Sequence, residues 1–135
     1  MDPLSISTSC VRLVASVTQV SIKIYNFVQE VRDAHADLES VKLELKSLKG
    51  VLETLSEHSA NFIISSSLVE NISGILTNCG GVLQTIETSL NKHSGGGMKN
   101  GAKWSLAGRE DMDKLRSSLE AHKSALSLAL EVVNL

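Results

Sequence analysis

The sequence predicts an all-α protein, an up-down four-helix bundle, and three observations support this prediction. Apolar residues recur in alternating steps of three and four along four segments, which is the spacing of a helix-bundle seam. Three breaks separate these segments, and short breaks favour antiparallel packing of consecutive helices. The chain contains one proline and 3% aromatic residues, whereas sheets favour aromatic and β-branched residues. Its 135 residues fit a single helical-bundle domain, 1–135.

The first predicted helix spans about residues 3–31, with Asp2 as its N-cap and Pro3 at its first helical position. Its polar residues form a thin stripe, so most of its circumference is apolar. Its core line contains Cys10, Leu13, Val17, Val20, Ile24, Phe27 and Val31. A second apolar line is expected to widen the buried face, at Val11, Ala15, Ile22 and Tyr25. Either neighbouring helices surround this helix, or part of its apolar surface is reserved for a partner or a lipid phase.

The second and third predicted helices span about residues 34–57 and 68–92. The core line of the second helix contains Ala34, Leu38, Val41, Leu45, Leu48, Leu52 and Leu55. The third helix is expected to begin with a capping box of Ser67 and Glu70, and its core line contains Leu68, Ile72, Ile75, Cys79, Val82, Ile86 and Leu90. Gly80 and Gly81 lie inside this one helix, which predicts a close helix crossing or a kink there.

The segment 94–101 has the glycine-rich composition of a flexible linker. The fourth helix is predicted at about residues 106–133, with Ser105 as its cap, and its core line contains Met112, Leu115, Leu119, His122, Leu126, Ala129 and Val133. If all four lines meet in one core, Leu45 and Leu48 should face residues of the first and fourth helices, namely Leu13, Val17 and Leu119.

The residues predict no catalytic, cofactor-binding or metal-binding site, and the chain is interpreted as a non-enzyme. Its four histidines never fall at the i, i+4 spacing that places two imidazoles on one helical face. Cys10 and Cys79 lie on core lines, where thiols act as small hydrophobic side chains, and their use favours a reducing, cytoplasmic compartment. The formal charge of −2 gives no global attraction to nucleic acid. The longest uncharged run of the first helix, Leu13 to Ile22, is about half of a membrane span.

One weak electrostatic signal lies around the fourth helix start. No acidic residue occurs between Glu87 and Glu110, and a basic patch with one aromatic residue is expected there: Lys92, Lys99, Lys103, Trp104 and Arg109. Such a patch could contact anionic lipid headgroups, or it could be a solvated linker that is basic. Its complement is the segment 30–57, in which acidic residues outnumber basic ones, so head-to-tail self-association is conceivable.

Several short motifs occur together in a fixed order along the whole chain. They are Met1-Asp2-Pro3-Leu4-Ser5-Ile6, Tyr25-Asn26-Phe27-Val28 with Val31-Arg32-Asp33-Ala34, Leu45-x-x-Leu48-x-x-Val51-Leu52, Cys79, and Lys103-Trp104-x-Leu106 leading into Leu126-x-Leu128-Ala129-Leu130. In this order and spacing the chain resembles the HeLo-like N-terminal domain of fungal STAND or NLR-like proteins. In that family the domain precedes a nucleotide-binding oligomerisation module and acts in signalling or cell death, as in heterokaryon incompatibility.

The resemblance implies a domain that self-associates when a receptor module outside this chain is triggered, with recruitment from the cytoplasm to the plasma membrane. It also implies that the first helix is the membrane-active and oligomerising element, through Leu4, Ile6, Leu13, Val17, Val20 and Ile24. The alternative is a helical protein-interaction scaffold without membrane activity, in which the first helix is only a central helix of the bundle. Indifference to liposomes would distinguish this scaffold.

Overall fold

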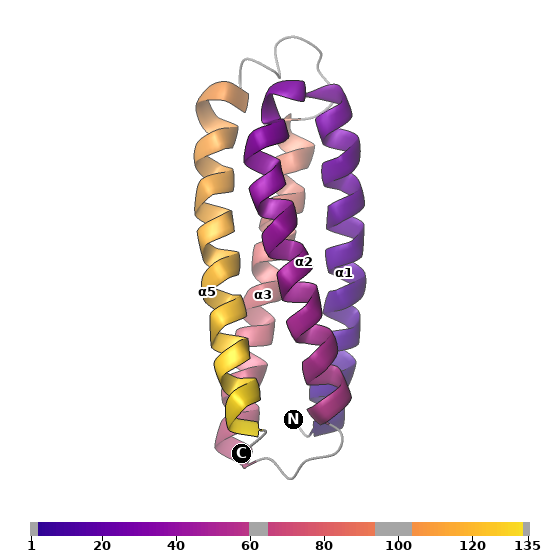
Figure 1. Cartoon of the computed structure of the whole chain (residues 1–135), viewed down its shortest axis with the longest axis vertical. Coiled ribbons are helices and arrows are strands. Elements are labelled where there is room, and N and C mark those ends of the chain that lie inside the picture. The colour runs from indigo at the N-terminus through magenta and orange to yellow at the C-terminus, as the bar shows by residue number, and fades with distance from the viewer. Residues whose placement is uncertain (1–2, 60–64, 94–103, 134–135) are drawn as a thin grey trace.

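The computed structural model describes residues 3–59, 65–93 and 104–133. Four long helices lie side by side along the molecule and alternate in direction (Figure 1). The elements in chain order are α1 (Pro3–Glu30), η1 (Arg32–Ala34), α2 (His35–Ser59), α3 (Ser66–His93), η2 (Trp104–Gly108) and α5 (Arg109–Val133). The prediction of an all-α four-helix bundle is confirmed.

The order of the helices around the bundle differs from their order in the chain. α1 packs against α2 and α3, and α5 also packs against α2 and α3. The consecutive helices α2 and α3 therefore lie at opposite corners, and the neighbours α1 and α3 run in the same direction (Figure 1). The hydrophobic period predicts which face of a helix is buried, but it does not say which helix covers that face.

One apolar cluster fills the space between the four helices. Leu45, Leu48 and Leu119 are completely buried, and Val17 is 1% exposed in the same cluster. Leu13 is partly buried and packs against the cluster. The predicted common core is therefore present.

α3 turns a slightly different face to the core than the sequence predicted. Its buried apolar residues are Val69, Ile72, Leu76, Cys79, Leu83, Ile86 and Leu90, whereas Leu68, Ile75 and Val82 are only partly buried. α1 and α5 both cover α3, so its apolar face is wide. The sequence therefore fits more than one line of apolar residues with the same seven-residue spacing. Only the packing selects the line at the centre.

The two adjacent glycines of α3 do not mark a close crossing. The helix is continuous through them, as predicted. A Cβ atom at Gly80 would lie 3.7 Å from Leu13 Cδ2, an ordinary contact, and a Cβ atom at Gly81 would meet nothing within 4 Å. Neither position needs glycine for space, so the predicted close crossing is wrong, whereas the predicted kink stays a prediction.

The starts of α3 and α5 also correct the sequence prediction. The Leu68 amide donates to Ser65 Oγ at 3.3 Å, so Ser65 caps α3 and the predicted capping box of Ser67 and Glu70 is wrong. A π-helical turn, η2, precedes α5 and contains Ser105 inside it rather than as a cap. The predicted N-cap Asp2 and the predicted linker 94–101 lie outside the described residues.

Candidate functional site

The residues predicted as the effector surface of the first helix lie in the core of the bundle. Ile6 and Ile24 are completely buried, and Val17 and Val20 are each 1% exposed. Leu13 is partly buried, and the side chain of Leu4 lies outside the described part of the chain. These residues share one face of α1, which α2 and α3 cover. In the folded domain the buried members of this set are therefore not available to a membrane or a partner.

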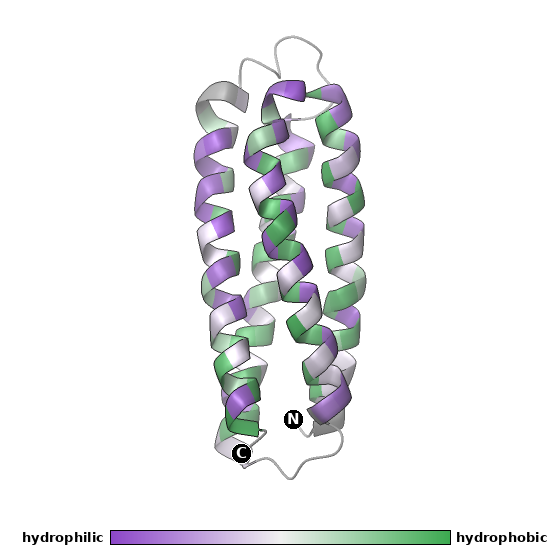
Figure 2. Ribbon diagram, in the orientation of Figure 1, coloured by the Kyte–Doolittle hydropathy of each residue, from purple (hydrophilic) through white to green (hydrophobic). Residues whose placement is uncertain are grey.

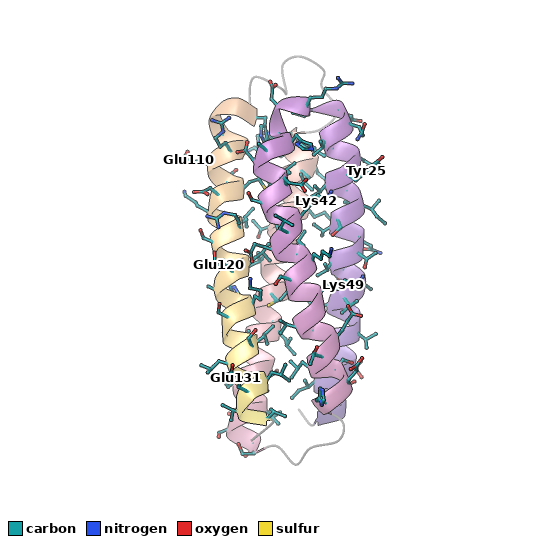
Figure 3. All side chains as sticks on the ribbon, viewed as in Figure 1. Tyr25, Lys42, Lys49, Glu110, Glu120 and Glu131 are labelled. Carbon is teal, nitrogen blue, oxygen red and sulfur yellow. The ribbon has the colours of Figure 1, made fainter. Side chains whose placement is uncertain are left out.

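The opposite face of α1 is apolar and exposed. Val11, Ile22 and Tyr25 are 60%, 56% and 60% exposed, and Ala15 and Thr18 between them are also exposed. Figure 3 shows Tyr25 projecting from α1 away from the other helices, on the opposite side of the bundle from Glu110, Glu120 and Glu131 of α5. The prediction that Val11, Ala15, Ile22 and Tyr25 widen the buried face is wrong, because α1 occupies a corner with two neighbours.

These five residues, Val11, Ala15, Thr18, Ile22 and Tyr25, are called the outer seam. The Thr18 hydroxyl donates to the Val14 carbonyl oxygen at 3.1 Å, so its hydrogen bond is satisfied within the helix. Figure 2 shows hydrophobic residues on both sides of α1, towards the bundle and away from it. α1 therefore carries two apolar faces, of which the fold uses one.

Few charges border the outer seam within α1. Arg12 is exposed, and Lys23 forms a salt bridge with Glu87 of α3. From Pro3 to Gln29 these are the two charged side chains of α1. On the edge towards α2, Ser7 Oγ lies 3.2 Å from the carbonyl oxygen of Ser56, to which it donates. Polar contacts therefore hold α1 to α3 and to α2. The outer seam faces neither of these helices.

The described residues of the predicted basic patch do not form one membrane-facing surface. Trp104 is completely buried, so it cannot act as an interfacial aromatic residue. Arg109 is exposed, with its Nε atom 3.5 Å from Asp37 Oδ2. Lys92 is exposed at the end of α3, and Lys99 and Lys103 lie outside the described residues.

Trp104 instead joins all four helices at one end of the bundle. Its ring centroid lies 5.2 Å from that of Phe27 in α1 and 5.5 Å from that of His93 at the end of α3, the latter in an edge-on arrangement. Its Nε1 atom donates to Asp37 in α2. Sequence reasoning missed this cluster. The signal in the sequence was the single tryptophan after a glycine-rich segment. Such a tryptophan is compatible with a buried anchor as well as with a membrane contact.

Cys10, Cys79 and His122 are the candidates for reactive side chains on the core lines. Burial raises the pKa of the Cys10 thiol to about 12, with a smaller contribution from Cys79, and burial raises the pKa of the Cys79 thiol to about 11. Both thiols therefore stay protonated near neutral pH and are poor nucleophiles. His122 is half-buried, with Nδ1 2.5 Å from the Ser118 carbonyl oxygen. No group of three or more His, Cys, Asp or Glu residues could hold a metal ion there.

A groove of about 470 Å³ lies between the starts of α2 and α5, and it is lined by both arginines and carboxylates. Arg109 pairs with Asp37, and Arg116 lies 3.4 Å from both Asp113 and Glu120. Since each arginine already faces a carboxylate, the groove does not offer an anion a concentrated positive charge. It is a weaker candidate site than the outer seam.

A comparison with protein families shows to which family this chain belongs. Residues 1–135 match the family described as pigment biosynthesis cluster protein PigL N-terminal. The chain belongs to this PigL N-terminal family. Its membership agrees with the broader expectation of a helical N-terminal domain of a fungal protein. It does not support the narrower HeLo-like assignment.

Two further comparisons gave no significant match, one with curated proteins and one with solved structures. Within the described residues of this PigL N-terminal domain, no helix is long and apolar enough to cross a bilayer.

Proposed function

We propose that this PigL N-terminal domain is a non-enzymatic signalling and oligomerisation domain, which self-associates when the rest of its protein brings several copies together. One observation carries the proposal: α1 exposes an aligned apolar stripe although its other face already fills the core. Among the residues that the structure describes, three of the six large exposed hydrophobic side chains, Val11, Ile22 and Tyr25, lie on this stripe. Aligned exposed apolar residues of this kind are typical of interaction surfaces.

Clustering should act through effective concentration. Tethered copies meet at about millimolar effective concentration, so a surface too weak to pair free chains can pair tethered ones. The activating module would then need only to bring copies together. No chemistry within the domain is required.

The test uses a ligand-induced dimerising tag fused after Leu135. If the domains attract each other, they add to the tag's own affinity, because the two associations are thermodynamically linked. We expect at least a tenfold lower apparent dissociation constant for ligand-induced dimerisation than for the tag alone. Equal constants with and without the domain would overturn the proposal.

A second candidate is latent membrane activity of α1, the activity that would kill cells. The low charge of α1 favours it, since only Arg12 and Lys23 interrupt the stretch from Pro3 to Gln29. Its residues Val17, Val20 and Ile24 are buried, so the bundle would have to open first. Clustering should then release dye from anionic vesicles. Clustered chains that pair but leave vesicles intact would leave the interaction scaffold as the function.

A further inference from the structure

Resting on the proposed function, the geometry points to a second copy of this chain as the occupant of the outer seam. We infer that two α1 helices pair antiparallel, about a two-fold axis that passes beside Thr18. A two-fold pair of this kind uses the same surface on both copies and closes, so it forms dimers and not filaments.

The outer seam has the spacing of a helix-packing seam. Its residues follow each other in steps of four, three, four and three. A seven-residue repeat of this kind is the spacing by which one helix packs along another. α1 already uses one such repeat, from Cys10 to Val31, inside the bundle. The exposed repeat therefore fits a helix as partner better than it fits a sheet edge or a small molecule.

The sizes of the seam side chains favour antiparallel over parallel pairing of the two α1 helices. With the axis between Thr18 and Gln19, and to within one residue along the helix, Val11 lies opposite Tyr25 of the second copy, Ala15 lies opposite Ile22, and Thr18 lies opposite itself. Each larger side chain therefore meets a smaller one. A parallel pair would place Tyr25 against Tyr25 and Ala15 against Ala15, which forces the helices apart at one end and leaves a void at the other.

The charges along the edges of the outer seam are also compatible with an antiparallel pair. The edge towards α3 carries Arg12, Gln19 and Asn26, seven residues apart. Antiparallel pairing places Arg12 opposite Asn26 of the second copy and Gln19 opposite Gln19, so these positions place no like charges opposite each other. Lys23 is already paired with Glu87. The edge towards α2 carries the small or apolar residues Ser7, Val14, Ser21 and Val28.

The size of the contact explains why pairing would depend on clustering. A single pair of helices meeting along five seam residues falls short of the roughly 1,200 Å² that stable protein complexes bury. Free chains should therefore dissociate at micromolar concentration. Tethered chains should pair, which makes the contact a response to clustering.

The decisive experiment is oxidative cross-linking between two single-cysteine variants, Val11→Cys and Tyr25→Cys, mixed at about millimolar concentration. The antiparallel pair predicts that the mixed disulfide exceeds either homodimer at least fivefold. The native Cys10 and Cys79 are buried and give little background. Leu43→Cys is the matched control, because Leu43 is 61% exposed on α2 and should form no preferred disulfide with either variant. Preferred Val11 or Tyr25 homodimers, or mixed disulfides no more frequent than with Leu43→Cys, would overturn the inference.

A charge substitution separates this inference from the proposed function. Ile22→Glu should raise the apparent dissociation constant for ligand-induced dimerisation of the tagged domain at least tenfold, whereas Leu43→Glu should leave it unchanged. Ile22 is 56% exposed, so both variants should keep the wild-type melting temperature. Self-association that survives Ile22→Glu would overturn the outer-seam dimer and retain the oligomerisation domain. Absence of self-association in the tethered wild-type domain would overturn both the outer-seam dimer and the proposed function.

Discussion

The Nε1 atom of Trp104 donates a hydrogen bond to Oδ2 of Asp37 at 3.3 Å, and this bond joins the π-helical turn before α5 to the first turn of α2. The same indole packs against Phe27 of α1 and His93 of α3. One completely buried side chain thus connects all four helices at one end of the bundle.

Replacing Trp104 should therefore be costly. Trp104→Ala should lower the free energy of unfolding by about 3–5 kcal/mol, because it removes a large buried ring and leaves a cavity. Tyr25→Ala, at an exposed aromatic residue, should stay within about 0.5 kcal/mol. Urea denaturation followed by circular dichroism measures both, since the Trp104 variant loses the fluorescent probe. Similar losses from the two substitutions would contradict the role of Trp104 as an anchor.

Two glycine substitutions should have opposite effects. A Cβ atom at Gly108 would overlap the Trp104 indole, lying 2.5 Å from Cδ2 and 2.6 Å from Cζ3, so Gly108→Ala should destabilise the domain. Gly81→Ala meets open space in a helix and should stabilise it by about 0.5–1 kcal/mol. Thermal melts of the two variants check the pair. A stable Gly108→Ala variant would mean that the indole can move away from η2.

The core register can be tested on two adjacent residues of α2. Leu45→Ala should cost about 2–5 kcal/mol, because Leu45 is completely buried and its truncation leaves a cavity. Lys46→Ala should change the free energy of unfolding by less than about 0.5 kcal/mol, since Lys46 is exposed. Chemical denaturation that gave equal effects would reject this register of α2.

The two buried thiols predict a loss of stability at alkaline pH. Burial raises the pKa of Cys10 from 9.0 to about 12 and that of Cys79 from 9.0 to about 11. The unfolded chain therefore loses these protons first, so their contribution is complete below pH 9 and declines as the pH rises towards 11–12.

Denaturation between pH 8 and about 11 checks this prediction against a Cys10→Ala, Cys79→Ala double variant, which controls for lysine and tyrosine titration. The decline should be shallower in the double variant. The thiols of the native protein should also react with Ellman's reagent only on unfolding. Identical pH profiles would show that the thiols do not contribute.

Sequence reasoning predicted the helices well and the role of individual faces less well. The core lines of α1 and α2 agree with the structure because each has a repeated set of large apolar residues at one angle. The prediction that the outer-seam residues are buried was wrong, because Val11, Ile22 and Tyr25 are as apolar as the residues in the core. Sequence reasoning was also wrong about Trp104, because a buried anchor and an exposed membrane contact have the same local sequence.

The sequence by itself determined that this chain forms four amphipathic helices with one common core, because the hydrophobic period is a property of each segment alone. The tertiary structure decided which helices are neighbours, which of the two apolar faces of α1 is covered, and where Trp104 lies. These depend on how many helices surround a given face. α1 stands at a corner with α2 and α3 as neighbours, and for that reason the outer seam from Val11 to Tyr25 remains exposed.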